Sequence, residues 1–256
     1  MIEKFTLTFP APTGVEERNA YIYVPDAWEQ NQDQRYPVLY MFDGHNVFFD
    51  EDATYGKSWG MAEFTAETEL PMIIAAVECN RHPDNGRLME YTPFPFDDPA
   101  FGHVSARGRK TMNWLVNKFK PYIDSRYPTL PEREFTFIAG SSMGGLMSLY
   151  ALMEYNHIFS RAAALSPSLW VSPRKVERMI HNAKLGPDTI LYMDYGSQEL
   201  AGRRMASVYG RITAALFEKG VFLTSRIVPW GTHSEASWER QIPYFMDTLF
   251  YGLEDQ

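Results

Sequence analysis

The stretch that decides the fold is residues 135–145, which reads Phe-Thr-Phe-Ile-Ala-Gly-Ser-Ser-Met-Gly-Gly. Its first five residues are aromatic, β-branched or small, a composition that favours a buried strand. The apolar segment that follows, 145–155, is predicted to be a helix. Between them, glycines at 140 and 144 flank Ser142, which predicts a tight strand-to-helix turn with this serine at its apex. A strand that passes directly into a helix is the repeating unit of parallel sheets.

The same alternation continues on both sides of this stretch. Further strands are predicted at 5–9, 20–24, 38–42, 72–77, 161–165, 189–195 and 222–228. Helices are predicted at 111–123, after Pro173, at 201–219 and at 234–249. Two antiparallel strands at the front, followed by repeated strand–helix units, predict an α/β fold. It is a mostly parallel eight-stranded sheet flanked by helices, a three-layer sandwich.

Composition limits the classes of partner. The 256 residues carry 24 Lys and Arg against 32 Asp and Glu, which gives a net charge of −8. Because such a chain has no basic face, we expect neither nucleic acid nor an anionic membrane surface as a partner. The longest apolar run, 72–77, is far shorter than the roughly 18–20 residues of a membrane span. With no internal repeat or linker, residues 1–256 are predicted to form a single domain.

The N-terminus and the cysteine content suggest where the protein works. No basic stretch at the N-terminus leads into an apolar one, so we expect no secretory signal. Cys79 is the only cysteine and cannot form an internal disulfide, so the fold needs no oxidising compartment. We therefore expect a cytoplasmic protein, for which a homo-oligomer is possible.

The turn at Ser142 has the pattern Gly-x-Ser-x-Gly, in which a strained turn projects a serine hydroxyl from the sheet. Side chains two residues before and after this serine would collide with the neighbouring strand and helix, which explains Gly140 and Gly144. Ser141 does not fit this register. The alternative is a glycine-rich turn that only packs, or that binds an anion at the helix N-terminus. The glycine spacings of phosphate and dinucleotide loops are absent.

A serine hydroxyl needs a base, and in this topology the base follows the last strand. Of the six histidines, only His233 lies there. An acid that orients it should follow the penultimate strand, where two carboxylates compete. Asp194 lies within that strand, whereas Glu199 lies in the loop beyond it, from which a carboxylate can reach the histidine. We predict Glu199 as the acid and Asp194 as a carboxylate that caps nearby main-chain N–H groups.

An oxyanion hole requires two main-chain N–H donors. The N–H of Met143 is one candidate, and the N–H of Gly44 or His45, after the third strand, is the other. His45 lies near Asp43, Asp50 and Asp52 in sequence, but their spacing is not that of a tight metal site, so we expect no metal ion and no organic cofactor. Cys79 is predicted to be a buried structural thiol.

Four short stretches carry a combination of motifs: 43–48 (DGHNVF), 140–145 (GSSMGG), 165–170 (LSPSLW) and 231–233 (GTH). Together they resemble the esterase D-like family of α/β-hydrolases. This family includes feruloyl and acetyl-xylan esterases, S-formylglutathione hydrolase and enterochelin-type siderophore esterases. The resemblance covers about residues 21–250 and implies an α/β-hydrolase fold with a triad of Ser142, Glu199 and His233. Asp43-Gly44, where many members have His-Gly, looks more like the siderophore esterases.

The long segment 80–107 leaves the carboxyl end of a strand and is rich in proline and aromatic residues. Segments of this length are uncommon in compact domains unless they form part of a site. We expect Phe94 and Phe96 from this segment, together with Trp170, to line the substrate pocket. The sequence thus predicts a serine carboxylic-ester hydrolase that acts on a small-molecule ester. The alternatives are a siderophore trilactone esterase and a non-catalytic binding module on the same scaffold.

Overall fold

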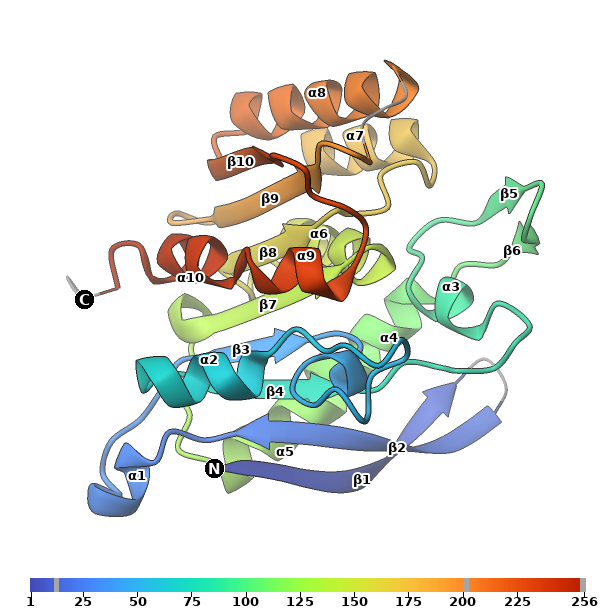
Figure 1. Cartoon of the computed structure of the whole chain (residues 1–256). Coiled ribbons are helices and arrows are strands. Elements are labelled where there is room, and N and C mark those ends of the chain that lie inside the picture. The colour runs from blue at the N-terminus through green and yellow to red at the C-terminus, as the bar shows by residue number, and fades with distance from the viewer. Residues whose placement is uncertain (12–13, 200–202, 254–256) are drawn as a thin grey trace.

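The computed structural model describes residues 1–11, 14–199 and 203–253, with residues 203–204 described for the main chain alone. Their central feature is an eight-stranded sheet with the strand order β1-β2-β4-β3-β7-β8-β9-β10 (Figure 1). Strands β1 and β2 pair antiparallel, as do β2 and β4, and all other neighbours in the sheet run parallel. The predicted mostly parallel eight-stranded sheet is therefore confirmed.

Each of the eight predicted strands is present; the ends of β8 and β10 match the prediction, and the other ends differ by up to six residues, the most at the start of β2. The strands are β1 (Ile2–Ala11), β2 (Gly14–Tyr23), β3 (Val38–Met41), β4 (Ile73–Val77), β7 (Thr136–Ser141), β8 (Arg161–Leu165), β9 (Ile190–Gly196) and β10 (Phe222–Val228). The first strands extend beyond the predicted runs because β1 and β2 pair along ten residues each, through exposed positions that carry no apolar signal.

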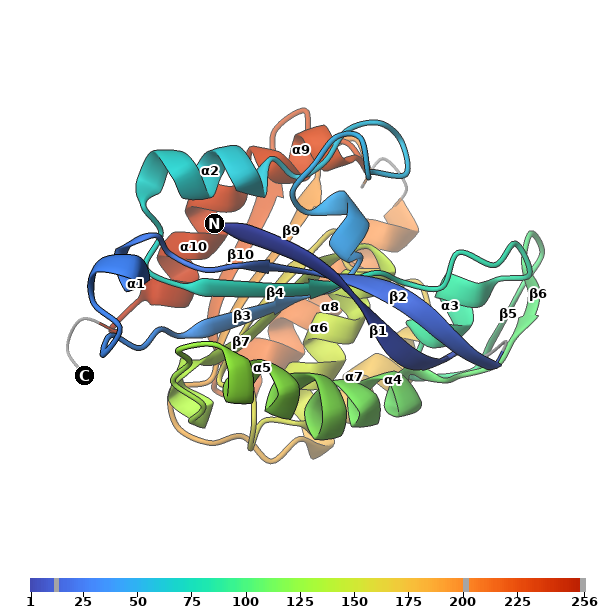
Figure 2. The same cartoon turned by 90° about the horizontal axis from the view of Figure 1, so that it is seen from below.

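Helices cover both faces of the sheet (Figure 2). On one face lie α2 (Met61–Thr68), α9 (Glu235–Glu239) and α10 (Ile242–Phe250). On the other lie α4 (Gly108–Trp114), α5 (Lys120–Arg126), α6 (Met143–Glu154), α7 (Pro173–Asn182) and α8 (Arg203–Glu218). The predicted three-layer sandwich is thus confirmed. Residues 201–202 of the predicted helix 201–219 lie outside the described residues.

The two layers of helices bury two separate cores, and side-chain alternation along β3 shows why. Val38 and Tyr40 point into the larger core, which packs against α4 to α8. Leu39 and Met41 point into the smaller core, which includes Trp238. Because β3 lies in the middle of the sheet, its side chains are buried on both faces, and a continuous apolar run is the expected sequence signal.

Two predicted helices are divided in the structure. The predicted helix 234–249 consists of α9 and α10, because Pro243 has no N–H to donate inside a helix and is tolerated only in the first turn of α10. The predicted helix 111–123 is interrupted by a π turn, Leu115–Phe119, just ahead of Pro121 in α5. In both cases proline decides where the regular hydrogen bonding restarts.

The segment 80–107 has structure of its own. It contains α3 (Gly86–Glu90) and a small hairpin of β5 (Phe96–Asp98) and β6 (Gly102–Val104), which extends away from the main sheet (Figure 1). Short elements also occur before it, namely α1 (Ala27–Gln30) and the 3-10 turn η1 (Gly44–Asn46). No described helix is both long enough and apolar enough to cross a membrane.

Candidate active site

Ser142 occupies the apex of the turn between β7 and α6 in a strained conformation, with φ 57° and ψ −119°. Its main-chain N–H donates to Leu165 O at 2.9 Å, which ties the turn to the end of β8. A Cβ added to Gly140 would come within 2.7 Å of the Gly144 carbonyl carbon, and one added to Gly144 would meet Phe42 and Asp43. The predicted collision is confirmed for Gly140, whereas a Cβ on Gly144 would make only a tight contact, 3.1 Å from the Phe42 side chain. The hydroxyl of Ser142 lies 3.4 Å from that of Ser168.

The structure brings Glu199 and His233 together. Glu199 Oε2 lies 2.5 Å from His233 Nδ1, although 34 residues separate them in sequence. The other carboxylate oxygen, Oε1, accepts hydrogen bonds from the Gly196 N–H at 2.9 Å and the Ser166 hydroxyl at 2.7 Å. Burial by itself would raise the pKa of Glu199, but these hydrogen bonds outweigh it and hold the pKa below its ordinary value. Glu199 is thus an ionised carboxylate directed at the histidine.

Asp194, the competing acid, makes different contacts. Its carboxylate accepts hydrogen bonds from the Tyr192 hydroxyl at 2.8 Å and from the Ser166 main-chain N–H at 3.1 Å. It therefore caps a main-chain N–H beside the site, as predicted for it. Asp194 is 1% exposed, and this burial raises its pKa to about 6.

The raised pKa of Asp194 gives a testable dependence of stability on pH. The unfolded chain releases this proton near pH 3.8, whereas the folded chain holds it to about pH 6. Between these values the folded state binds more protons, so folding stability falls as pH rises. Asp194→Asn removes this titration. From about pH 4 to about pH 7, urea unfolding should show the variant gaining on the order of 2–3 kcal/mol relative to wild type. Parallel pH dependences of the two proteins would contradict this.

The turn after β3 contains the N–H groups of Gly44 and His45, which the sequence offered as donors for an oxyanion hole beside that of Met143. Asp43 adopts a left-handed conformation, with φ 57°, and η1 begins at the next residue. Gly44 and His45 open this 3-10 turn and Met143 opens α6, so their N–H groups belong to first turns, which leave such donors without helical partners. A Cβ on Gly44 would lie 2.8 Å from the main-chain N of Val77, which explains glycine at this position.

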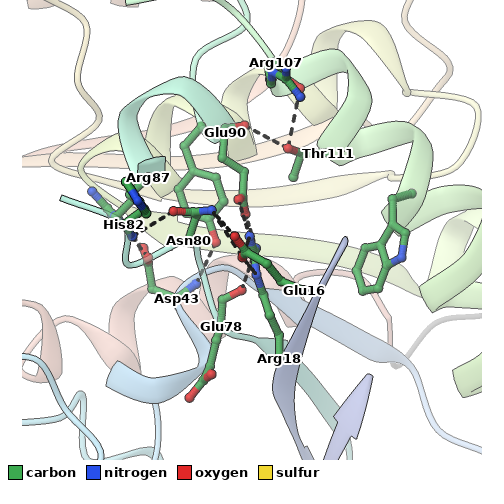
Figure 3. Close-up of polar contacts among 12 residues, drawn as sticks. Glu16, Arg18, Asp43, Glu78, Asn80, His82, Arg87, Glu90, Arg107 and Thr111 are labelled. Atoms are coloured by element: carbon green, nitrogen blue, oxygen red, sulfur yellow. Dashed lines mark hydrogen bonds and ion pairs between the residues drawn. The ribbon is translucent and has the colours of Figure 1, made fainter. Parts of the chain in front are cut away.

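The carboxylate of Asp43 is held by Arg87 of α3 (Figure 3). Arg87 donates from Nε and Nη2 to the two oxygens of Asp43, at 2.8 and 2.7 Å. Burial would raise the pKa of Asp43, but the charge of Arg87 lowers it below its ordinary value. The Tyr91 hydroxyl also contacts this turn and accepts a hydrogen bond from the Asp43 N–H at 3.2 Å. A bidentate ion pair and one hydroxyl thus fix the turn that carries Gly44 and His45.

A second ion pair anchors α3 to the edge of the sheet (Figure 3). Arg18 on β2 donates to both oxygens of Glu90, at 2.6 and 2.8 Å, and both side chains are buried. Burial raises the pKa of Glu90 to about 7 despite this partner. Asn80 donates to Glu16 of the same strand at 3.0 Å and accepts from the His82 N–H. The start of the segment 80–107 is therefore fixed to the body.

One group of potential metal ligands occurs among the described residues, and it differs from the group weighed in the sequence. Asp43, His45 and Cys79 place potential ligand atoms within 4.8 Å of one another, all buried. Asp50 and Asp52 instead contact Ser58 and Lys4. Arg87 already neutralises Asp43, and burial raises the pKa of Cys79 well above its ordinary value, which favours the neutral thiol. Cys79 is buried, as predicted.

Two cavities lie beside these residues. The first, of about 900 Å³, is lined by Ser142 and His233 together with residues from the turn after β3 and from α3. The second, of about 750 Å³, is lined by Glu199, Phe96 and Trp170. The Phe96 and Trp170 rings meet edge to face, with centroids 5.4 Å apart. Because Glu199 lines one cavity and bonds a histidine that lines the other, this pair lies between the two cavities.

The predicted pocket residues are distributed differently from the expectation. Trp170 and Phe96 line the second cavity, whereas the first contains Ser142. Phe94 packs against the larger core and is not among the described residues that line either cavity. Sequence reasoning gave no role to Arg87, Ser166 or Trp238. A signal for Ser166 was available, because it lies in the motif 165–170 at the end of a strand.

Known proteins similar to this chain include esterases. The model of a family described as "Putative esterase" matches residues 13–249. The uncharacterized protein YbbA of Bacillus subtilis is 26% identical over 195 residues, which cover 75% of this chain and 72% of that protein. A siderophore triacetylfusarinine C esterase of Aspergillus fumigatus is 27% identical over 172 residues, 64% of this chain. The match spans just over half of that esterase, 55% of its length.

Solved structures show the same fold at low sequence identity. An IroE-like serine hydrolase from Shewanella oneidensis superposes with a TM-score of 0.74 and 19% identity. The match covers 99% of this chain and 81% of that one. This likeness establishes the α/β-hydrolase fold, and the family model spans all but the ends of the chain. The chain therefore belongs to this family of esterases.

Proposed function

We propose that the protein is a serine carboxylic-ester hydrolase in which Ser142 is the nucleophile, His233 the general base and Glu199 the acid that orients the histidine. The observation that carries the proposal is the contact of 2.5 Å between Glu199 and His233, with His233 and Ser142 lining one cavity. An ionised carboxylate can only accept hydrogen bonds, so His233 Nδ1 carries the proton and Nε2 remains free to act as a base.

In the first half of the reaction, the Ser142 oxygen attacks the ester carbonyl carbon and His233 Nε2 takes the serine proton. The negative charge that develops on the carbonyl oxygen is stabilised by the Met143 N–H and by the N–H of Gly44 or His45. When the carbon–oxygen bond breaks, His233 returns the proton to the departing alcohol. Water then attacks the acyl-serine while His233 again accepts a proton. When the bond between the acyl carbon and the Ser142 oxygen breaks, His233 returns this proton to the serine and the acid is released.

The aromatic walls of the second cavity suit an ester with an acyl or alcohol group of moderate size. A siderophore ester is the second candidate, favoured by the likeness to the Aspergillus fumigatus esterase. A panel of p-nitrophenyl, feruloyl, acetyl-xylan and siderophore esters, assayed with the purified protein, separates these candidates. Hydrolysis of none of them, with the fold intact, would favour a non-catalytic binding module.

Substitutions in the second cavity should change substrate preference. Trp170→Ala and Phe96→Ala remove wall contacts, so they should lower kcat/KM for a bulky aryl ester by about 10- to 100-fold relative to p-nitrophenyl acetate. Phe94→Ala is the matched control, because this ring packs against the same core as Phe96 but is not among the described residues that line either cavity. It should lower the melting temperature and leave the ratio of the two substrates unchanged. Equal losses on both esters for Trp170→Ala would mean that the tryptophan is structural.

We propose that hydrolysis uses no metal ion or organic cofactor, because the steps above need only side chains and main-chain donors of this chain. Dialysis against EDTA should leave kcat unchanged when p-nitrophenyl acetate is the substrate. Loss of activity on chelation, with recovery on adding a divalent ion, would instead assign a required metal to Asp43, His45 and Cys79. The variant Cys79→Ser would then have to lose the same activity.

A further inference from the structure

A chain of hydrogen bonds with only one possible direction leads to Glu199 from the core. It begins at the indole of Trp238 on α9, whose Nε1 lies 3.0 Å from the Ser166 hydroxyl oxygen. An indole N–H can only donate, so the Ser166 oxygen must accept this hydrogen bond. The same hydroxyl lies 2.7 Å from Glu199 Oε1, and an ionised carboxylate can only accept. The single proton of Ser166 must therefore point to Glu199.

This direction decides which oxygen of Glu199 faces the histidine. Oε1 receives two donors, the Ser166 hydroxyl and the Gly196 N–H at 2.9 Å. Oε2 is left to His233 Nδ1. With two donors on one oxygen, rotation of the carboxylate away from His233 would break both of these bonds. Because these donors are fixed in the folded structure, the Glu199 carboxylate needs no reorganisation when the reaction occurs.

Ser166 is itself held tightly. It follows β8 with a φ of 42°, a left-handed conformation that is uncommon for a serine, and it is 2% exposed. Its main-chain N–H donates to the carboxylate and to the main-chain carbonyl of Asp194, at 3.1 Å each. Asp194 in turn accepts from Tyr192. The hydrogen bonds to Asp194 hold the Ser166 backbone in this strained conformation. The same conformation directs the Ser166 hydroxyl at Glu199.

Trp238 contacts the histidine as well. Its ring lies edge to face with the His233 ring, at a centroid distance of 5.0 Å and an interplanar angle of 82°. Trp238 thus packs against the base directly and reaches the acid through Ser166. The His233 side chain is 47% exposed, so few other contacts restrict it.

We propose that Ser166 and Trp238 are positioning residues for ester hydrolysis, and that the Trp238 N–H sets the direction of the Ser166 hydroxyl, which locks Glu199 onto His233. This inference rests on the proposed triad. Ser166 is not among the described residues that line either cavity, so its loss should lower kcat and leave KM nearly unchanged. Trp238 lines the cavity that contains Ser142, so for Trp238→Phe the readout is kcat alone.

Two substitutions remove single links of this chain, and each has a matched control. Ser166→Ala keeps the Cβ and removes the hydroxyl, and Ser160→Ala does the same to a buried serine at the opposite end of β8. Trp238→Phe removes the indole N–H, and Trp59→Phe makes the same change in the neighbouring ring, 6.0 Å away in the same core. We expect Ser166→Ala to lower kcat by about 10- to 100-fold and Trp238→Phe by about tenfold. Both controls should affect mainly the melting temperature.

The double variant separates positioning from packing. If the indole acts on catalysis through Ser166, adding Trp238→Phe to Ser166→Ala should lower kcat by less than twofold more. A second readout is the far-downfield proton NMR signal expected for the short Nδ1–H bond of His233. It should be sharp in wild type and in both controls, and should broaden or disappear in Ser166→Ala.

Multiplicative losses in the double variant, or an unchanged proton signal in Ser166→Ala, would overturn the inference. Its failure is distinguishable from failure of the proposed triad by including Ser142→Ala in the same assays. If Ser142→Ala is inactive while Ser166→Ala and Trp238→Phe behave like their controls, the triad stands and the positioning chain is wrong. If Ser142→Ala remains active, the triad itself is wrong.

Discussion

Ser142→Ala is expected to lower kcat by about 10³-fold or more on every ester that the protein accepts, with the fold intact. The reason is that no acyl-enzyme can form without the hydroxyl, while the main-chain donors of Met143 and the η1 turn continue to bind the substrate. Ser141→Ala is the matched control, because this serine precedes the turn and lines the same cavity. It should retain most of the activity.

A fluorophosphonate probe provides an independent check on the nucleophile. It should label wild-type protein and Ser141→Ala at Ser142, as mapped by peptide mass spectrometry, and should not label Ser142→Ala. Equal activity of Ser142→Ala and wild type, or a label found on another residue, would refute the mechanism.

The second large effect concerns the acid. Glu199→Gln replaces an oxygen that accepts from His233 with an amide, which can stabilise the wrong tautomer of the histidine, so kcat should fall by up to about 10⁴-fold. Asp194→Asn should cost less than tenfold, because the bonds of Asp194 go to Tyr192 and to the main chain of Ser166. Steady-state kinetics on both variants, with circular dichroism to confirm folding, tests the ranking. The reverse order would assign the acid to Asp194.

Much of the fold could be predicted because the signals were local. The strands at the centre of the sheet are buried on both faces and give continuous apolar runs, as at 38–42, and β10 begins and ends where predicted. The helix α2 was missed because it is short and has four exposed residues, and α3 because five residues are too few to show an apolar period. The boundary between α9 and α10 depends on Pro243, a local signal that the amphipathic pattern concealed.

In the candidate site, too, residues with a local sequence signal could be predicted and residues without one could not. Ser142 and His233 could be predicted because a glycine turn and a position after the last strand are marked in the sequence. The placement of Glu199 beside His233 followed from the order of strands and loops. Arg87 and Trp238 could not be found, since their partners lie 44 residues away in one case and 72 in the other. Such pairs form only when strands distant in sequence become neighbours.

The segment 80–107 consists of a half that is bonded to the sheet and a hairpin whose ends, Phe96 and Val104, are buried in the larger core. This division affects how such proteins can diversify. The first half is tied to the sheet through Arg87 and Tyr91 at the Asp43 turn and through Glu90 at Arg18, so a chimaera that replaced it would disrupt the candidate oxyanion turn. The hairpin of β5 and β6 extends from the body and contributes Phe96 to the second cavity. Grafting tips of other sequence and length between Phe96 and Val104, with these two core residues retained, should therefore exchange one substrate range for another while the chemistry is retained.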